Sequence, residues 1–216
     1  MVRNRFRLSC ELSGQKCRRR DWTGNSWEET GPRHGCWKSR GRSLSRSRVQ
    51  PAWFKVLQSH CAERFTVTID YPKRSIKIEE PSDYNYTGPG VQVPLEFKGP
   101  LPYARATIHI QGNPPVEDLF LVDSGSSDEV DHPLIAKSRA GTETAPGGIG
   151  LGTPIEARLG RVDLLELGPF KIRGATGIAT ESGLGSRLIG AGVLSRFKVI
   201  FDYQRSRMFL EEETGQ

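Results

Sequence analysis

The sequence predicts an all-β fold, because apolar and polar residues alternate in short runs that are separated by turn-forming residues. One pair of runs covers residues 64–71 and 75–78, on either side of the turn at residues 72–74. A second pair covers residues 104–110 and 118–122. Every second side chain of a strand lies on the same face, so each run can cover a core with one face. Both pairs are therefore expected to form β-hairpins.

The composition changes near residue 60. Residues 1–60 contain 14 Lys and Arg against 4 Asp and Glu, whereas residues 61–216 contain 17 against 21. All four Trp and all four Cys lie at or before residue 61. No hydrophobic period is sustained in the first part. Residues 1–63 are therefore predicted to be a basic segment that is disordered or not native to the fold that follows.

This basic segment suggests two binding functions. The stretch 40–48, Arg-Gly-Arg-Ser-Leu-Ser-Arg-Ser-Arg, could bind RNA phosphates, but short basic tracts are usually solvated. Cys10, Cys17, His34 and Cys36 lack the paired spacing of a zinc site. We therefore predict no nucleic acid partner, no metal and no cofactor.

The sequence contains no signal for a membrane. No run of about 18 apolar residues occurs, as a membrane-spanning helix would need. The first residues lack the apolar region of a secretory signal. The expected location is cytoplasmic, or outside the cytoplasm if the true N-terminus is missing.

Residues 64–80 recur near the C-terminus. Residues 196–212 align with them without gaps at an offset of 132 positions, and seven of the seventeen aligned residues are identical. The identical residues include Arg, Asp and two Glu, which a shared pattern of apolar residues does not require. The alignment therefore indicates an internal duplication.

The tripeptide Asp-Ser-Gly follows the apolar run 118–122 directly. Such residues are ordinary turn formers, but here the strand would deliver the carboxylate of Asp123 into a tight loop. Gly125 would let the backbone bend close by, and Ser124 and Ser126 could donate hydrogen bonds to the carboxylate. Asp123 is therefore the candidate catalytic residue.

A second motif, Leu-Ile-Gly at residues 188–190, begins 65 residues after Asp123 and precedes a short run with helical character. A glycine-rich run at residues 147–152 lies between the two motifs. This order resembles that of the retropepsin-like aspartic peptidases, the one-lobe relatives of pepsin. Their pattern is a strand ending in Asp-Thr/Ser-Gly, a flap, a hydrophobic-hydrophobic-Gly turn, a short helix and a terminal hairpin. The likeness is greatest to bacterial aspartyl proteases with two such lobes in tandem, and it covers about residues 64–216.

The resemblance implies a fold and a domain plan. Residues 96–216 would form a closed or partly closed β-barrel lobe with a flap hairpin and one or two short helices. Residues 64–80 would be the remaining terminal hairpin of a truncated first lobe, and residues 81–95, rich in Pro and Gly, a linker. The site residues that the resemblance implies are catalytic Asp123, Ser124 and Gly125, flap residues Gly147, Gly148, Ile149 and Gly150, and the supporting turn Leu188, Ile189 and Gly190.

The implied activity is that of an aspartic endopeptidase. It needs two carboxylates that share one proton, because two like charges about 3 Å apart do not both ionise. No other Asp-Thr/Ser-Gly occurs in the sequence, and the position 132 residues before Asp123 would precede Met1. The second carboxylate is therefore expected from a homodimer or from a second lobe in trans. The alternative is a catalytically inactive β-barrel that binds peptides or partners.

Other interpretations of these residues are weaker. The glycine-rich run 148–152 lacks the strand–helix context of a phosphate loop, and no G-x-S-x-G elbow supports a serine hydrolase. His132 is expected in a surface turn. The acidic run 128–131 is expected to be solvated, or to line a cleft that favours basic peptides. Asp70 and Asp202 are expected to have structural roles in their hairpins.

Overall fold

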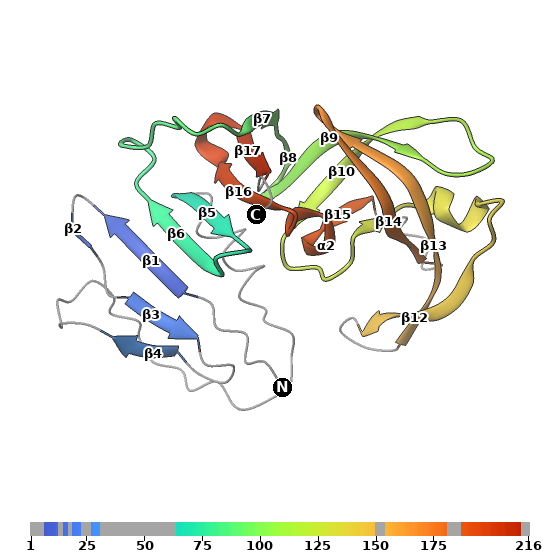
Figure 1. The fold of residues 1–216 in the computed structure, drawn as a ribbon, viewed down its shortest axis with the longest axis horizontal. Coiled ribbons are helices and arrows are strands. Elements are labelled where there is room, and N and C mark those ends of the chain that lie inside the picture. Colours follow the sequence, from blue (N-terminus) through green and yellow to red (C-terminus); the bar gives the residue numbers. More distant parts are fainter. Residues whose placement is uncertain are drawn as a thin grey trace.

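The computed structural model describes residues 64–149, 154–180 and 187–212, together with the backbone of four strands before residue 31 (Figure 1). These four strands fall within the segment that was predicted to be disordered or non-native. They are β1 (Arg7–Leu12), β2 (Gln15–Lys16), β3 (Arg19–Trp22) and β4 (Trp27–Thr30). The side chains considered for zinc and the basic stretch 40–48 lie outside the described residues.

Six strands close into a barrel, which confirms the predicted all-β fold class. Each strand pairs with the next around the ring, and β13 pairs back onto β9 to close it. The strands in ring order are β9 (Leu101–His109), β10 (Val116–Asp123), β15 (Leu188–Gly190), β11 (Val130–Asp131), β14 (Phe170–Thr180) and β13 (Pro154–Leu167).

Two further strands extend the barrel sheet, and the described residues from 96 onward contain three short helices. Strand β8 (Glu96–Lys98) extends β9, and β12 (Glu143–Ile149) extends β13. The helices are the 3-10 turn η2 (Pro133–Lys137), the α-helix α2 (Ala191–Leu194) and the 3-10 turn η3 (Tyr203–Arg205). Ile108, Phe120, Val162, Leu165 and Ile189 are fully buried in the core of the lobe.

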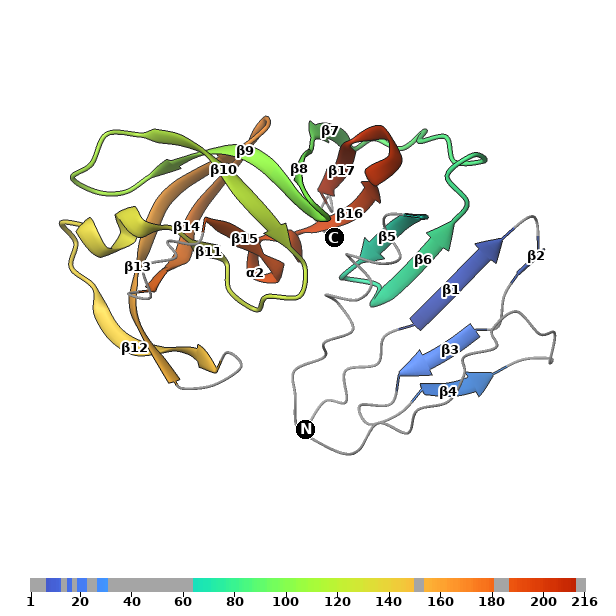
Figure 2. The same ribbon diagram turned by 180° about the vertical axis from the view of Figure 1, so that it is seen from behind.

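The two repeated hairpins lie together in a second sheet, outside the barrel (Figure 2). The sheet runs through β6 (Ser75–Glu79), β5 (Thr66–Asp70), β16 (Phe197–Asp202), β17 (Arg207–Glu212) and β7 (Val91–Pro94). Strand β1 continues it in parallel with β6. Strand β7 lies within the stretch that was predicted as a linker, and it pairs with β17 while burying Val93. The prolines and glycines around this short strand led to the prediction of a linker.

The two hairpins meet around a local two-fold axis. In the antiparallel pair of β5 and β16, Thr68 lies opposite Ile200, which is its own equivalent 132 positions later. Val67 lies opposite Phe201 and Ile69 opposite Val199, so the register is symmetric about the central pair. The backbone agrees with the duplication that the sequence indicates.

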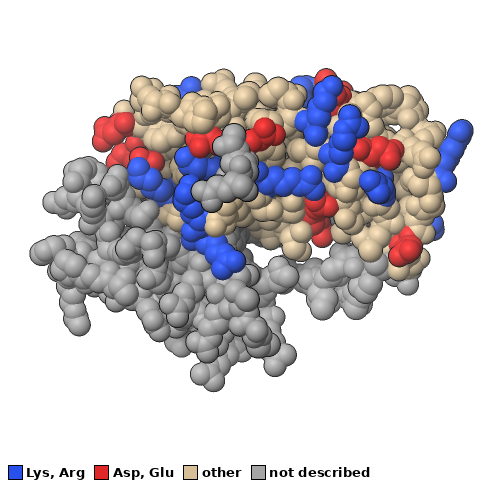
Figure 3. Space-filling model, in the orientation of Figure 1, with Lys and Arg blue, Asp and Glu red and all other residues tan. Residues whose placement is uncertain are grey.

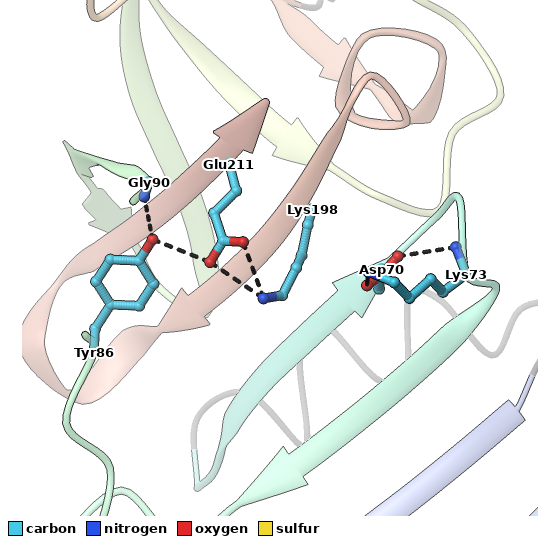
Figure 4. Close-up of polar contacts among 6 residues, drawn as sticks. All are labelled: Asp70, Lys73, Tyr86, Gly90, Lys198 and Glu211. Atoms are coloured by element: carbon cyan, nitrogen blue, oxygen red, sulfur yellow. Dashed lines mark hydrogen bonds and ion pairs between the residues drawn. The ribbon is translucent and has the colours of Figure 1, made fainter. Parts of the chain in front are cut away.

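The turns of the two hairpins are also equivalent. Arg74 and Ser206, again 132 positions apart, have φ of 48° and 49°, and they are the two residues other than glycine with positive φ in the described ranges. Asp70 accepts the Lys73 amide at 2.9 Å and the Lys73 Nζ at 3.2 Å (Figure 4). Asp202 accepts Arg207 Nε at 2.8 Å in the other turn. Both aspartates therefore fasten turns, as predicted.

The chain entering β7 is fastened to the terminal hairpin (Figure 4). The Tyr86 ring stacks on Phe209 with 3.9 Å between the ring centroids, and its hydroxyl donates to Glu211 Oε1 at 3.1 Å. Glu211 also accepts from Lys198 Nζ at 3.0 Å. The Gly90 amide donates to the Tyr86 hydroxyl. These contacts hold β7 beside β17.

The described surface is mixed in charge. Figure 3 shows basic and acidic side chains interspersed over the visible face of the described residues. Among these residues, no helix is both long and apolar enough to cross a membrane.

Candidate active site

The Asp123 carboxylate lies where two strands of the barrel run side by side. Strands β10 and β15 are parallel, with Val122 opposite Ile189 and Asp123 opposite Gly190. The Gly125 amide donates to Asp123 Oδ1 at 2.8 Å. Two motifs that are 65 residues apart in the sequence therefore meet at the end of β10.

The loop after Asp123 crosses the start of helix α2. The Gly190 amide donates to the Glu129 carbonyl at 3.0 Å, and the Ala191 amide donates to the Ser126 carbonyl at 2.8 Å. A Cβ atom at Gly190 would lie 2.2 Å from the Asp128 carbonyl oxygen. Only glycine allows this approach, because real Cβ contacts are longer. Gly190 therefore fixes the position of the loop that holds Asp123.

The serines of the loop differ from the prediction in one respect. Ser124 is buried, with 3% of its surface exposed. The hydroxyl of Ser126 donates to Asp128 Oδ2 at 3.2 Å, so it was wrong to expect this hydroxyl on Asp123. The backbone amide of Gly125 donates the hydrogen bond to the Asp123 carboxylate instead.

The acidic run 128–131 is built into the loop rather than solvated. Glu129 Oε1 accepts Arg196 Nη2 at 2.5 Å, and Oε2 accepts the Thr176 amide. Burial alone would raise the pKa of Glu129, but these two partners outweigh it and hold the pKa below its usual value. Asp131 is buried in β11. The expectation that this run is solvated was therefore wrong for both residues.

Tyr71 is a residue near the site that the sequence did not identify. It follows β5 in the first hairpin, and its hydroxyl is buried without a hydrogen-bond partner among the described residues. Burial, and then the negative charge of Asp123, raise the pKa of Tyr71, so the hydroxyl keeps its proton. In the sequence, Tyr71 stands out because it is identical to its repeat equivalent, Tyr203. This identity does not indicate that the charge of Asp123 acts on Tyr71.

His132 lies inside the lobe, so its expected place in a surface turn was wrong. It is 2% exposed and packs beside Phe120, with 5.4 Å between ring centroids. Its Nδ1 accepts the Leu134 amide at 3.2 Å and thereby caps η2. Its Nε2 faces Asp118 Oδ2 at 3.6 Å. A buried imidazole that accepts on Nδ1 is neutral and carries its proton on Nε2.

Burial lowers the pKa of His132, although the Asp118 carboxylate opposes this shift. The unfolded chain then binds a proton at higher pH than the folded chain does. The contribution of His132 to stability is present above the ordinary pKa of about 6.5, and it is lost as pH falls toward the lowered value.

The His132→Asn substitution should therefore flatten the pH dependence of stability. Asn can retain the cap on the Leu134 amide but does not titrate. Between pH 7 and pH 5, the free energy of unfolding should fall more steeply in the wild type than in the variant, as urea titrations would measure. Parallel curves for the two proteins would contradict the assignment. Asp118 also titrates, but below this pH range. Burial would raise its pKa, and the hydrogen bonds from the Leu119 amide and Arg187 outweigh burial and lower the pKa below its usual value.

The predicted flap residues lie partly in a hairpin. Strand β12 contains Gly147, Gly148 and Ile149 and pairs antiparallel with β13, with an irregularity between Pro146 and Ile149. Gly150 and the tip of the hairpin lie outside the described residues. Of the predicted site residues, the structure brings together Asp123, Gly125 and the turn at residues 188–190.

A hollow of about 500 Å³ lies at the base of this hairpin. It is lined by Ala140, Gly141, Thr142, Glu143, Leu159, Gly160 and Thr176, and not by Asp123. In the described part of the chain, no group of three or more His, Cys, Asp or Glu side chains is placed to hold a metal ion. The carboxylate of Asp123 is held at the start of the loop by the Gly125 amide.

The comparisons with known proteins found a match among solved structures alone. No family model and no curated protein matches the sequence. Among solved structures, the chain is similar to a retropepsin-like aspartic protease from Rickettsia conorii, with 19% sequence identity and a TM-score of 0.44. The match covers 59% of this chain and 95% of that protein. At this identity the likeness concerns the fold alone, and the strand order and register described above define the barrel.

Proposed function

We propose that the chain supplies one half of the active site of an aspartic endopeptidase, with Asp123 as its carboxylate. The observation that supports this most directly is the position of Asp123 at the end of β10, beside Gly190 and with the Gly125 amide on Oδ1. A carboxylate fixed by backbone groups in this way is presented in one orientation. Catalysis by positioned acids and bases requires such an orientation.

The proposed reaction is the hydrolysis of a peptide bond by an activated water. The ionised carboxylate of a pair takes a proton from the water, whose oxygen forms a bond to the carbonyl carbon. The protonated carboxyl group gives its proton to the carbonyl oxygen. Collapse of the resulting diol breaks the C–N bond, and the leaving nitrogen takes the proton that the first carboxylate received from the water. The other carboxylate recovers its proton from a hydroxyl of the diol. Asp123 is one member of the pair, and a second chain would supply the other.

The β12–β13 hairpin is the proposed flap. Gly147, Gly148, Ile149 and Gly150 would close over an extended substrate, because glycine-rich hairpins adopt several backbone conformations. Peptide or protein chains are accordingly the proposed substrates, and no cofactor takes part.

Incubation of the full chain with an unstructured protein at mildly acidic pH would test the proposal. New peptide termini should appear, and the rate per chain should rise with chain concentration, because each site takes one carboxylate from each of two chains. Mass spectrometry of the products would identify the cleaved bonds. A folded chain that cleaves nothing over the whole concentration range would overturn the proposal.

The presence of a single Asp-Ser-Gly supports a second candidate function. A lobe with one carboxylate and no partner would be a barrel that binds peptides without cleaving them. Calorimetry with the same unstructured protein distinguishes the two, since binding without product formation at any concentration favours the second.

A further inference from the structure

Strand β5 covers the edge of β16 in a manner that depends on the duplication. Thr68 lies opposite Ile200, its own repeat equivalent, and the neighbouring pairs are symmetric about this point. When a residue pairs with its own equivalent, the two segments are related by a two-fold axis, as in an isologous dimer interface. The β5–β6 hairpin therefore lies on β16 where the β16–β17 hairpin of a second copy of this chain would lie.

The match between the two hairpins extends beyond the register. Their turns share the same left-handed residue, at Arg74 and Ser206. Each strand before the turn ends in a buried Asp that binds the turn, at Asp70 and Asp202. A hairpin of the second copy would thus reproduce the backbone that β16 now contacts.

We infer that the edge of β16 is a docking surface for a second copy of this chain, and that the β5–β6 hairpin is its internal occupant. This inference rests on the proposed function, because the site lacks its second carboxylate without another copy. To dock, the second copy displaces β5–β6 from β16 and pairs its own β16 there. Its barrel then brings a second Asp123 toward the first.

The exchange keeps the chemistry of the pairing. In the closed chain, Ile200 lies opposite Thr68 and Lys198 opposite Asp70. In the exchanged pair, Ile200 lies opposite the second copy's Ile200, and Lys198 opposite the second copy's Asp202. An apolar pair replaces a mixed one, and a basic residue again lies opposite an acidic one.

The exchange also accounts for the position of Tyr71. Its buried hydroxyl lies within reach of the Asp123 charge and has no hydrogen-bond partner among the described residues. By the repeat, the second copy's Tyr203 takes this place when the hairpin leaves.

Exchange has a cost that makes it depend on concentration. Val67, Ile69, Ile76 and Ile78 are buried in the hairpin and lose part of their cover when it leaves β16. The loss is the same at every concentration, while the gain from a second copy follows mass action. Residues 80–85 connect β6 to Tyr86, which stays on Phe209 while β7 stays on β17. The hairpin can move on this connection once the bond from Arg205 Nη2 to the Pro81 carbonyl, at 3.1 Å, is broken.

A reversible cross-link between the central pair tests the inference in the full chain. The Thr68→Cys/Ile200→Cys variant, with the four native cysteines replaced by serine, would be compared oxidised and reduced. Sedimentation should show the oxidised chain as a monomer at all concentrations and the reduced chain as a dimer at high concentration. The chain with Thr68→Cys alone controls for the oxidant. Dimers of equal affinity in both states would overturn the inference.

Sedimentation separates this inference from the proposed function. Dimers that form only in the reduced chain but cleave nothing would sink the proposed function and leave the docking surface in place. Cleavage by the oxidised monomer would overturn the docking surface and leave Asp123 as a catalytic candidate.

A second variant applies if the cysteine pair does not fold. The Ile76→Ala substitution removes buried packing from the hairpin, where the side chain is 2% exposed, and leaves β16 unchanged. The concentration at which half of the chains are dimeric should fall by roughly tenfold or more. Ile172→Ala makes the same truncation in the barrel, at 5% exposure, and should leave that concentration unchanged. An equal effect of the two substitutions would contradict the inference.

Discussion

A chain with Asp123→Asn should fold like the wild type and lose its cleavage activity. Asn has nearly the same shape, and its Oδ1 can still accept the Gly125 amide, which now donates at 2.8 Å. At the mildly acidic pH of the assay, an amide can neither take a proton from the attacking water nor donate one to the substrate carbonyl as a carboxyl group can. The rate of peptide release should fall by about 10²- to 10⁴-fold, the range that positioned acids and bases contribute.

The matched control is Asp128→Asn in the same loop. The Asp128 carboxylate accepts the Ser126 hydroxyl, and an amide oxygen can replace it there. Circular dichroism would show whether both variants keep the fold, and the release of peptides would be measured in parallel. Wild-type cleavage by the Asp123→Asn chain would remove Asp123 from the reaction, and equal losses in both variants would point to the loop rather than to the carboxylate.

A chain with Gly190→Ala should be strongly destabilised. The new Cβ would lie 2.2 Å from the Asp128 carbonyl oxygen and 3.1 Å from the Ser126 carbonyl oxygen. Both contacts are with backbone, which has no alternative rotamer to adopt. Overpacking of this kind should lower the free energy of unfolding by about 2–4 kcal/mol, as urea denaturation would measure.

Gly99→Ala provides the comparison. A Cβ there would meet nothing within 4 Å, but the φ of +60° is unfavourable for alanine. The expected loss is about 1–2 kcal/mol from the backbone alone. A loss at Gly190 no larger than at Gly99 would show that the loop yields, and that Gly190 does not fix the position of Asp123.

The sequence predicted the elements that a pattern of neighbouring residues determines. The alternation in residues 64–78 and 104–122 produced the expected hairpins, and the turn at residues 188–190 precedes helix α2 as the resemblance implied. The contact between Asp123 and Gly190 depends on parallel pairing of strands that are far apart in the sequence. No local pattern encodes such a pairing, and here the order of motifs in a known family supplied it.

The features that the sequence missed depend on tertiary packing. His132 follows an acidic run and suggested a surface turn, yet the barrel folds over it and its ring caps η2. Strand β7 pairs with the edge of β17, whereas its own residues only weakly indicate a strand. Tyr71 follows β5, and the charge of Asp123, at the end of β10, acts on its hydroxyl. In each case the deciding partner lies in another segment.

The symmetric pairing of β5 with β16 also affects how the two repeats can diverge. In an assembly of identical chains, any change at an axis residue appears on both sides of the axis at once. Within one chain, the two residues at the axis are encoded separately. Thr68 and Ile200 can therefore differ although they occupy equivalent positions. A substitution in β5 then alters only the closed chain, whereas a substitution in β16 alters the closed chain once and the exchanged pair twice. The balance between the two forms can therefore be changed through β5 without altering the interface between copies.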